Sequence, residues 1–213
     1  MIGLLKKDLF ALKQMYLKNL LIVFVLYTVM VLMMEVTFLV YFIIWLMSFY
    51  SLSAFSLDEA SGWHRYARTL PVSAGQVVGA RYLTAVVMTA VGVAFGLAVS
   101  GVYGVLNRQS TDDLCFTIPL IAGLALASVG LLLPAAYQWG ADKARNAFLV
   151  LFMLVCAGVY LLRGYDAVKD VLVFLEKLLE RGFLLPLLAL AAGILILLAG
   201  FAASCAIYRK KEF

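Results

Sequence analysis

The sequence predicts an all-α polytopic membrane protein, and three observations support this prediction. Of the 213 residues, 65% are hydrophobic and 14% are charged, whereas soluble domains contain about 45–50% apolar residues. The apolar residues gather into runs long enough to cross a bilayer, and most charges lie between these runs. A water-soluble globule could not bury so much apolar surface, so lipid must surround much of the chain. The length allows one domain, 1–213.

The first long apolar run extends from Leu20 to Leu57 and contains a single charged residue, Glu35. One helix of this length would measure about 57 Å, nearly twice the hydrocarbon core of about 30 Å. We therefore place Glu35 in a turn between two spans, which keeps its charge away from the bilayer centre. With the later apolar runs, six spans are predicted, at 18–34, 37–56, 79–104, 114–138, 146–163 and 184–208.

The distribution of basic residues predicts the orientation of these spans. With a cytoplasmic N-terminus, twelve of the 17 lysine and arginine residues lie inside, and five lie outside: Arg108, Arg163, Lys169, Lys177 and Arg181. Positive charge favours the cytoplasmic side, so both termini are expected there, in the cytoplasmic membrane of a bacterial cell. The net charge of +5 is then explained by topology and by contact with anionic membrane lipids, without nucleic acid.

The N-terminal segment, 1–17, has the pattern of an amphipathic helix. Leu5, Leu9, Leu12 and Tyr16 recur at helical spacing, while lysines occupy other positions on the wheel. We expect this segment to lie on the inner leaflet as an interfacial helix before the first span.

The first cytoplasmic loop, 57–78, is an unusually polar segment, "DEASGWHRYARTLPVS" over residues 58–73. Asp58 and Glu59 are expected to begin a short helix, which leads into a turn imposed by Pro71. Ser73 can cap the following helix. One face of the short helix carries Trp63, Tyr66 and Leu70. From the residues alone, this aromatic face fits a protein contact and a headgroup anchor equally well.

No combination of residues in the sequence indicates catalysis. The chain contains no GxxxxGK[ST] phosphate loop, no HExxH and no GxSxG motif, and it has one histidine, His64. We therefore expect no catalytic residue, no metal site and no cofactor of its own.

Two cytoplasmic motifs resemble those of a known family. The first is "DEASGWHRYARTLPVSAGQVVGARYL", and the second is "LPAAYQWGADKARNAFL", which matches a Pro…Tyr…Gly-x-(Asp/Glu)-Lys-x-Arg pattern. Both are similar to the signatures of the small six-helix permease subunits of type V ABC exporters, including exporters of phenol-soluble modulins and antimicrobial peptides. One departure is Arg81, where lysine is more usual.

The resemblance implies a permease that dimerises with a second copy or a paralogue. It also implies export of a hydrophobic or amphipathic substrate, such as a peptide, driven by ATP that a separate cytoplasmic ATPase subunit binds. The 57–78 loop would be the coupling helix that fits a groove of this ATPase. The residues expected at this contact are Asp58, Glu59, Trp63, Tyr66, Leu70, Pro71, Lys143 and Arg145.

Three alternatives to this function stay open. A substrate-binding membrane subunit of a vitamin importer would need a polar pocket, and the spans contain few polar residues. A non-transporting immunity or sensor protein would need no ATPase. A membrane enzyme would need a motif that the chain lacks.

Three further patterns remain. An aromatic stripe in the second span could line a substrate path or pack against protein and lipid; it consists of Phe38, Phe42, Trp45 and Phe49. The third span contains a stripe of small residues that permits close helix packing: Gly92, Gly96, Ser100 and Gly104. Residues 164–182 predict an extracellular amphipathic helix before the last span.

Overall fold

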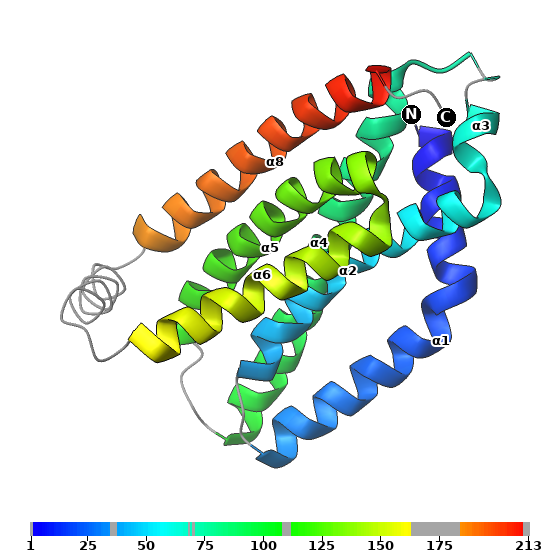
Figure 1. Ribbon diagram of the computed structural model, residues 1–213. Helices are drawn as coiled ribbons and strands as arrows, with labels where there is room; N and C mark the ends of the chain where they lie inside the picture. The colour runs from blue at the N-terminus through cyan, green and yellow to red at the C-terminus, as the bar shows by residue number, and fades with distance from the viewer. Residues whose placement is uncertain are drawn as a thin grey trace.

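The computed structural model describes residues 2–34, 38–67, 69, 71–107, 112–162 and 184–210. Helices are the only regular secondary structure in these described residues. The helices are α1 (Ile2–Met34), α2 (Phe38–Ser61), α3 (Trp63–Ala67), α4 (Ala74–Asn107), α5 (Asp112–Trp139), α6 (Ala141–Leu162) and α8 (Leu184–Lys210). Figure 1 shows the long helices running side by side, with α3 and both chain ends at the same end of the molecule.

Five of the described helices are long and apolar enough to cross a membrane. Their candidate spans are Gly3–Val31, Tyr41–Ser61, Ala74–Leu106, Thr117–Trp139 and Leu185–Lys210. The prediction of a multi-pass helical membrane protein is therefore confirmed. α6 covers most of the predicted fifth span, but it is not among these five candidates. The count of six spans therefore stays a prediction. The predicted extracellular helix at 164–182 lies outside the described residues.

The structure joins two segments that were predicted separately, and the interfacial position of the first one stays a prediction. The expected interfacial helix 1–17 and the first span 18–34 form one continuous helix, α1. No proline or glycine follows Gly3 in this helix, so nothing in the sequence interrupts it. The predicted apolar face is real, but it packs on protein: Leu12 is buried, and the Tyr16 ring lies 5.7 Å from that of Tyr50.

The structure also corrects the start of the loop helix. α2 continues through Asp58 and Glu59 to Ser61, so these acids lie in its last turn instead of opening a new helix. The end is set by Gly62, whose φ of 66° is a left-handed conformation that only glycine adopts at little cost. The five-residue α3 follows directly.

The predicted cap of α4 is confirmed and is reciprocal. The backbone N–H of Gln76 donates to the Ser73 hydroxyl at 3.3 Å, and the backbone N–H of Ser73 donates to the Gln76 side chain at 3.0 Å. This capping box fixes where the chain re-enters the helical bundle after the Pro71 turn.

Glycines bring two helix pairs into close contact. A Cβ at Gly92 would lie 3.1 Å from the Cα of Ile44, so the predicted small-residue stripe of α4 packs against α2 at this position. A closer contact joins α5 to α8 through four glycines, which we call the glycine contact: Gly123, Gly130, Gly193 and Gly200. A Cβ at Gly130 would lie 2.9 Å from the Cα of Leu197, and a Cβ at Gly193 would lie 2.9 Å from the Cα of Gly123.

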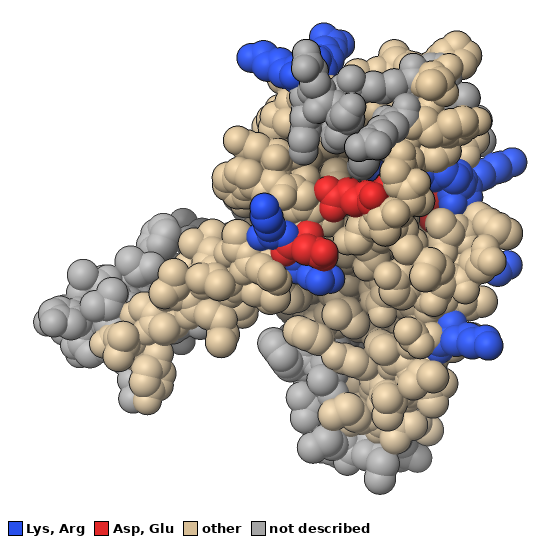
Figure 2. Space-filling model, turned by 45° about the vertical axis from the view of Figure 1, so that its right-hand side comes forward, with Lys and Arg blue, Asp and Glu red and all other residues tan. Residues whose placement is uncertain are grey.

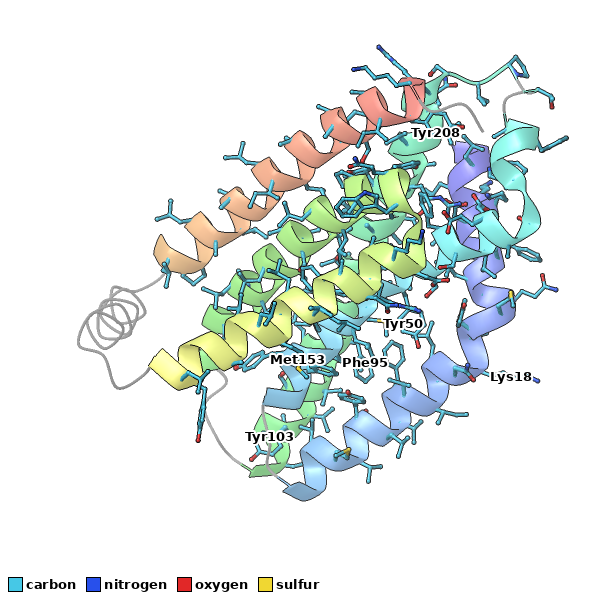
Figure 3. All side chains as sticks on the ribbon, in the orientation of Figure 1. Lys18, Tyr50, Phe95, Tyr103, Met153 and Tyr208 are labelled. Carbon is cyan, nitrogen blue, oxygen red and sulfur yellow. The ribbon has the colours of Figure 1, made fainter. Side chains whose placement is uncertain are left out.

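Every charged side chain that the structure describes belongs to a segment predicted to be cytoplasmic or to the cytoplasmic end of a predicted span. On the face drawn in Figure 2, these side chains lie at the top, around the middle and along the right-hand edge, while the described surface at the bottom shows none. We call the end of the molecule where α3 and the C-terminal end of α8 lie the charged end. Figure 3 places Tyr208 at this end and Tyr103 at the opposite end, and the Lys18 side chain points away from the other helices.

This separation of charge predicts the membrane topology. In a background without the native cysteines, single cysteines at Ser61 and Gln109 should react with a membrane-impermeant maleimide from opposite faces, with Ser61 accessible from the cytoplasm. Labelling of intact cells and of inverted vesicles measures this. Labelling of both sites from one face would contradict the predicted topology.

Candidate functional site

A ring of buried ion pairs lies at the charged end, where α1, α2 and α4 meet. Lys7 Nζ is 2.8 Å from Asp58 Oδ1 and 3.1 Å from Asp8 Oδ1. Arg81 completes the ring: its Nη1 is 3.0 Å from Asp8 Oδ2, and its Nη2 pairs with Asp58. Each carboxylate therefore contacts both cations. We call Lys7, Asp8, Asp58 and Arg81 the ion-pair ring.

The ring is balanced in charge, and three of its four members are buried while Lys7 is partly exposed. Asp8, Arg81 and Asp58 are 2%, 4% and 8% exposed. The Thr84 hydroxyl donates to Asp8 Oδ2 at 3.4 Å. Burying an isolated charge is costly, whereas alternating opposite charges in contact compensate for one another. The ring thus holds the N-terminal part of α1 to the last turn of α2 and the second turn of α4.

α3 contacts this ring through an aromatic side chain. The ring of Trp63 lies 4.0 Å from Lys7 Nζ, which is the geometry of a cation–π contact. Trp63 also packs against Tyr66, with ring centroids 5.3 Å apart. Trp63 is half-buried by these contacts, while Tyr66 is 57% exposed. Of the predicted aromatic face, Tyr66 is therefore the described residue that faces outward, and Leu70 lies outside the described residues.

Glu59 connects the two predicted cytoplasmic loops. The backbone N–H of Ala141, the first residue of α6, donates to Glu59 Oε2 at 3.2 Å. Gly140, with a φ of 93°, forms the turn between α5 and α6. A carboxylate at a helix N-terminus accepts an unsatisfied N–H and stabilises the positive end of the helix dipole. The end of α2 and the start of α6 are thereby held together.

The basic residues predicted in the second loop are exposed at this same position. Lys143 and Arg145 lie in the first turns of α6 and face solvent. Arg145 Nη2 is 3.4 Å from Asp142 Oδ1, an exposed pair on one helix. Pro71 is also exposed. The structure therefore brings Tyr66, Pro71, Lys143 and Arg145 to the same end of the molecule as solvent-facing residues, whereas Asp58 and Trp63 face inward.

The aromatic stripe of α2 packs mainly against α6. The Trp45 ring is 5.8 Å from Phe152, and the Phe49 ring is 5.6 Å from Phe148. Trp45 also donates a hydrogen bond from Nε1 to the Ser128 hydroxyl of α5 at 3.1 Å. Phe42 stacks near Tyr27 of α1 at 6.2 Å. The Phe38 side chain lies outside the described residues. These contacts make the stripe part of the packing between helices.

Sequence reasoning missed the roles of Lys7, Asp8 and Arg81. A signal was present, because an arginine just inside an apolar segment and an acid in a helix rich in leucine both need partners. The partners come from three separate segments, because Asp58 is 51 residues from Lys7 and 23 residues from Arg81. Their pairing could not be read without knowing how the helices pack.

The described part of the chain is thus a multi-pass helical membrane protein with a charged end in which its polar loops are held together. A family model described as ABC-2 family transporter protein matches residues 3–209. The chain belongs to this family. It is therefore a membrane permease subunit of an ABC transporter, and the family implies an ATPase partner that hydrolyses ATP. Neither the curated proteins nor the solved structures gave a match.

Proposed function

We propose that this permease belongs to an exporter of the type V architecture and that its ATPase binds at the charged end. The ATPase would contact the exposed Tyr66 of α3, the exposed Pro71, and Lys143 and Arg145 in the first turns of α6. Leu70, which the sequence predicts on the same face as Tyr66, is proposed to join this contact. The observation that carries the proposal is the hydrogen bond from Ala141 to Glu59. It joins the two loops into one surface, so a single bound protein can move both.

The proposal also gives the inward residues a role. Trp63 packs over Lys7, so force applied to α3 is passed to the helices behind it through contacts already made. A short helix held in this way moves as a rigid body when two ATPase subunits close. Dimerisation with a second permease would place two such surfaces on the cytoplasmic side, one for each ATPase subunit.

The substrate that we propose is hydrophobic or amphipathic, such as a membrane-active peptide. The described core is apolar: its largest buried side chains include Phe55, Ile43 and Met47. This composition favours a substrate that partitions into lipid over one that needs a polar pocket.

Reconstitution with the cognate ATPase tests the proposal. Inverted membrane vesicles that contain both subunits should accumulate a fluorescein-labelled amphipathic peptide when ATP is added, because export from the cell is uptake into an inverted vesicle. Vesicles with either subunit alone should not. Uptake by right-side-out vesicles with internal ATP would indicate an importer, and the absence of any complex with the ATPase would refute the proposed contact.

Tyr66→Ala is expected to weaken ATPase binding by about 2 kcal/mol, roughly a 30-fold rise in Kd, because an exposed tyrosine at the centre of a contact is a common hot spot. Titration of the ATPase onto permease in nanodiscs measures this. Tyr160→Ala on α6 is the matched control, since Tyr160 has a similar exposure of 62%. Equal affinities for both variants would show that α3 is not the contact.

A further inference from the structure

Two observations about α1 are not explained by membrane anchoring. Its first turns contribute two members of the ion-pair ring, Lys7 and Asp8, and the apolar face of this segment packs on protein. An anchor needs neither feature, because lipid would cover the apolar face and water or headgroups would solvate the charges. The N-terminal part of α1 is instead fixed to the two helices that flank α3.

The ion-pair ring includes one residue from each of the two helices on either side of α3, namely α2 and α4. Asp58 lies one turn before the end of α2, and Arg81 lies in the second turn of α4. Lys7 pairs with Asp58, Asp8 pairs with Arg81, and Lys7 additionally lies against the Trp63 ring. The N-terminal part of α1 therefore contacts the end of α2, α3 and the beginning of α4 through charged or cation–π interactions.

We infer that Lys7 and Asp8 are positioning residues for coupling, which make the N-terminal part of α1 move with α3 during the ATPase cycle. The inference rests on the proposed ATPase contact at α3 and extends it to a segment that does not touch the ATPase through these side chains. Separating α1 from the ring would expose buried charges, so the ring favours joint movement over sliding.

The α5–α8 pair supplies a fixed reference for measuring this movement. Its backbones touch at the glycine contact, and such a closely packed pair resists relative displacement. Leu198 of α8 is 58% exposed and suits a spin label, as do Phe10 of α1, which is 66% exposed, and Ser61 at the end of α2. Distances among these three labels separate movement of α1 from movement of the α3 region.

The test uses the full permease in complex with its ATPase, with and without a non-hydrolysable ATP analogue. In the parent, the analogue should change both the Phe10–Leu198 and the Ser61–Leu198 distances, while the Phe10–Ser61 distance stays constant. In the double variant Lys7→Gln/Asp8→Asn, Ser61 should still move, but the change at Phe10 should be lost. This variant keeps the Arg81–Asp58 pair and the neutral charge of the ring.

Two controls distinguish positioning from folding. Lys7→Arg retains the positive charge and should behave as the parent. Lys13→Gln removes an exposed lysine of the same helix that is outside the ring, and it should also behave as the parent. If Ser61 moves in the parent and Phe10 does not, or if Phe10 still moves in the double variant, the inference is wrong and the proposed ATPase contact stands. If Ser61 itself does not move, both are wrong.

Discussion

Replacement of Arg81 by methionine is expected to destabilise the permease by about 3–5 kcal/mol, because it leaves buried charge without its partner. Arg81 contacts both carboxylates of the ion-pair ring, and without it Asp8 and Asp58 face each other across a site with Lys7 as the single cation. Methionine keeps much of the side-chain length, so the loss reflects charge more than packing. The midpoint of thermal unfolding in detergent measures the effect.

Two further variants check the physical cause. Arg145→Met removes an arginine from an exposed pair and should change stability by about 0–1 kcal/mol. Arg81→Met/Asp58→Asn restores charge balance by leaving Lys7 paired with Asp8, so it should recover part of the stability lost in Arg81→Met. An Arg81→Met variant as stable as Arg145→Met would show that the ring does not hold the helices together.

Gly130→Ala is expected to destabilise the protein by about 1–3 kcal/mol through overpacking of the glycine contact. The added Cβ would lie 2.9 Å from the backbone of Leu197, which cannot move aside as a flexible side chain could. Gly130→Leu should have a larger effect and separate α5 from α8. A disulfide between neighbouring positions on the two helices, formed in the parent and lost in the variant, reports this separation.

Gly101→Ala is the matched control for this prediction. Gly101 lies within α4, and a Cβ there meets nothing within 4 Å. The same substitution should therefore raise stability by about 0.5–1 kcal/mol, since alanine loses less backbone entropy in a helix. A loss of stability in both variants would mean that glycine itself, and not the close approach at Gly130, matters.

Much of the fold could be predicted because hydropathy alone marks segments that lipid must surround. The predicted span 37–56 corresponds to α2, and 114–138 nearly coincides with α5. The Ser73 cap was predictable because capping depends on residues four positions apart or fewer. The end of α2 was not, because hydropathy falls at Asp58 while the helix continues until Gly62 allows a left-handed turn.

The site could be predicted in composition but not in arrangement. The exposed Tyr66 and the basic residues Lys143 and Arg145 occur in loops that the pattern of apolar runs already marked as cytoplasmic. The inward direction of Asp58 and the bond from Ala141 to Glu59 depend on how α2 packs against α1, α4 and α6. The glycine contact was missed for a related reason, since glycines seven residues apart attract no notice in helices rich in alanine and leucine.

The exposed apolar surface of α6 affects the choice of detergent or lipid for the purified protein. Its aromatic contact with α2 involves Phe148 and Phe152, whereas Met153, Leu154 and Leu161 beyond it are 70%, 63% and 75% exposed. Fewer contacts with the other described helices therefore fix the tilt of its distal half. Bilayer thickness and detergent chain length should alter α6 before they alter α5 or α8, so nanodiscs of matched thickness are the appropriate medium for functional measurements.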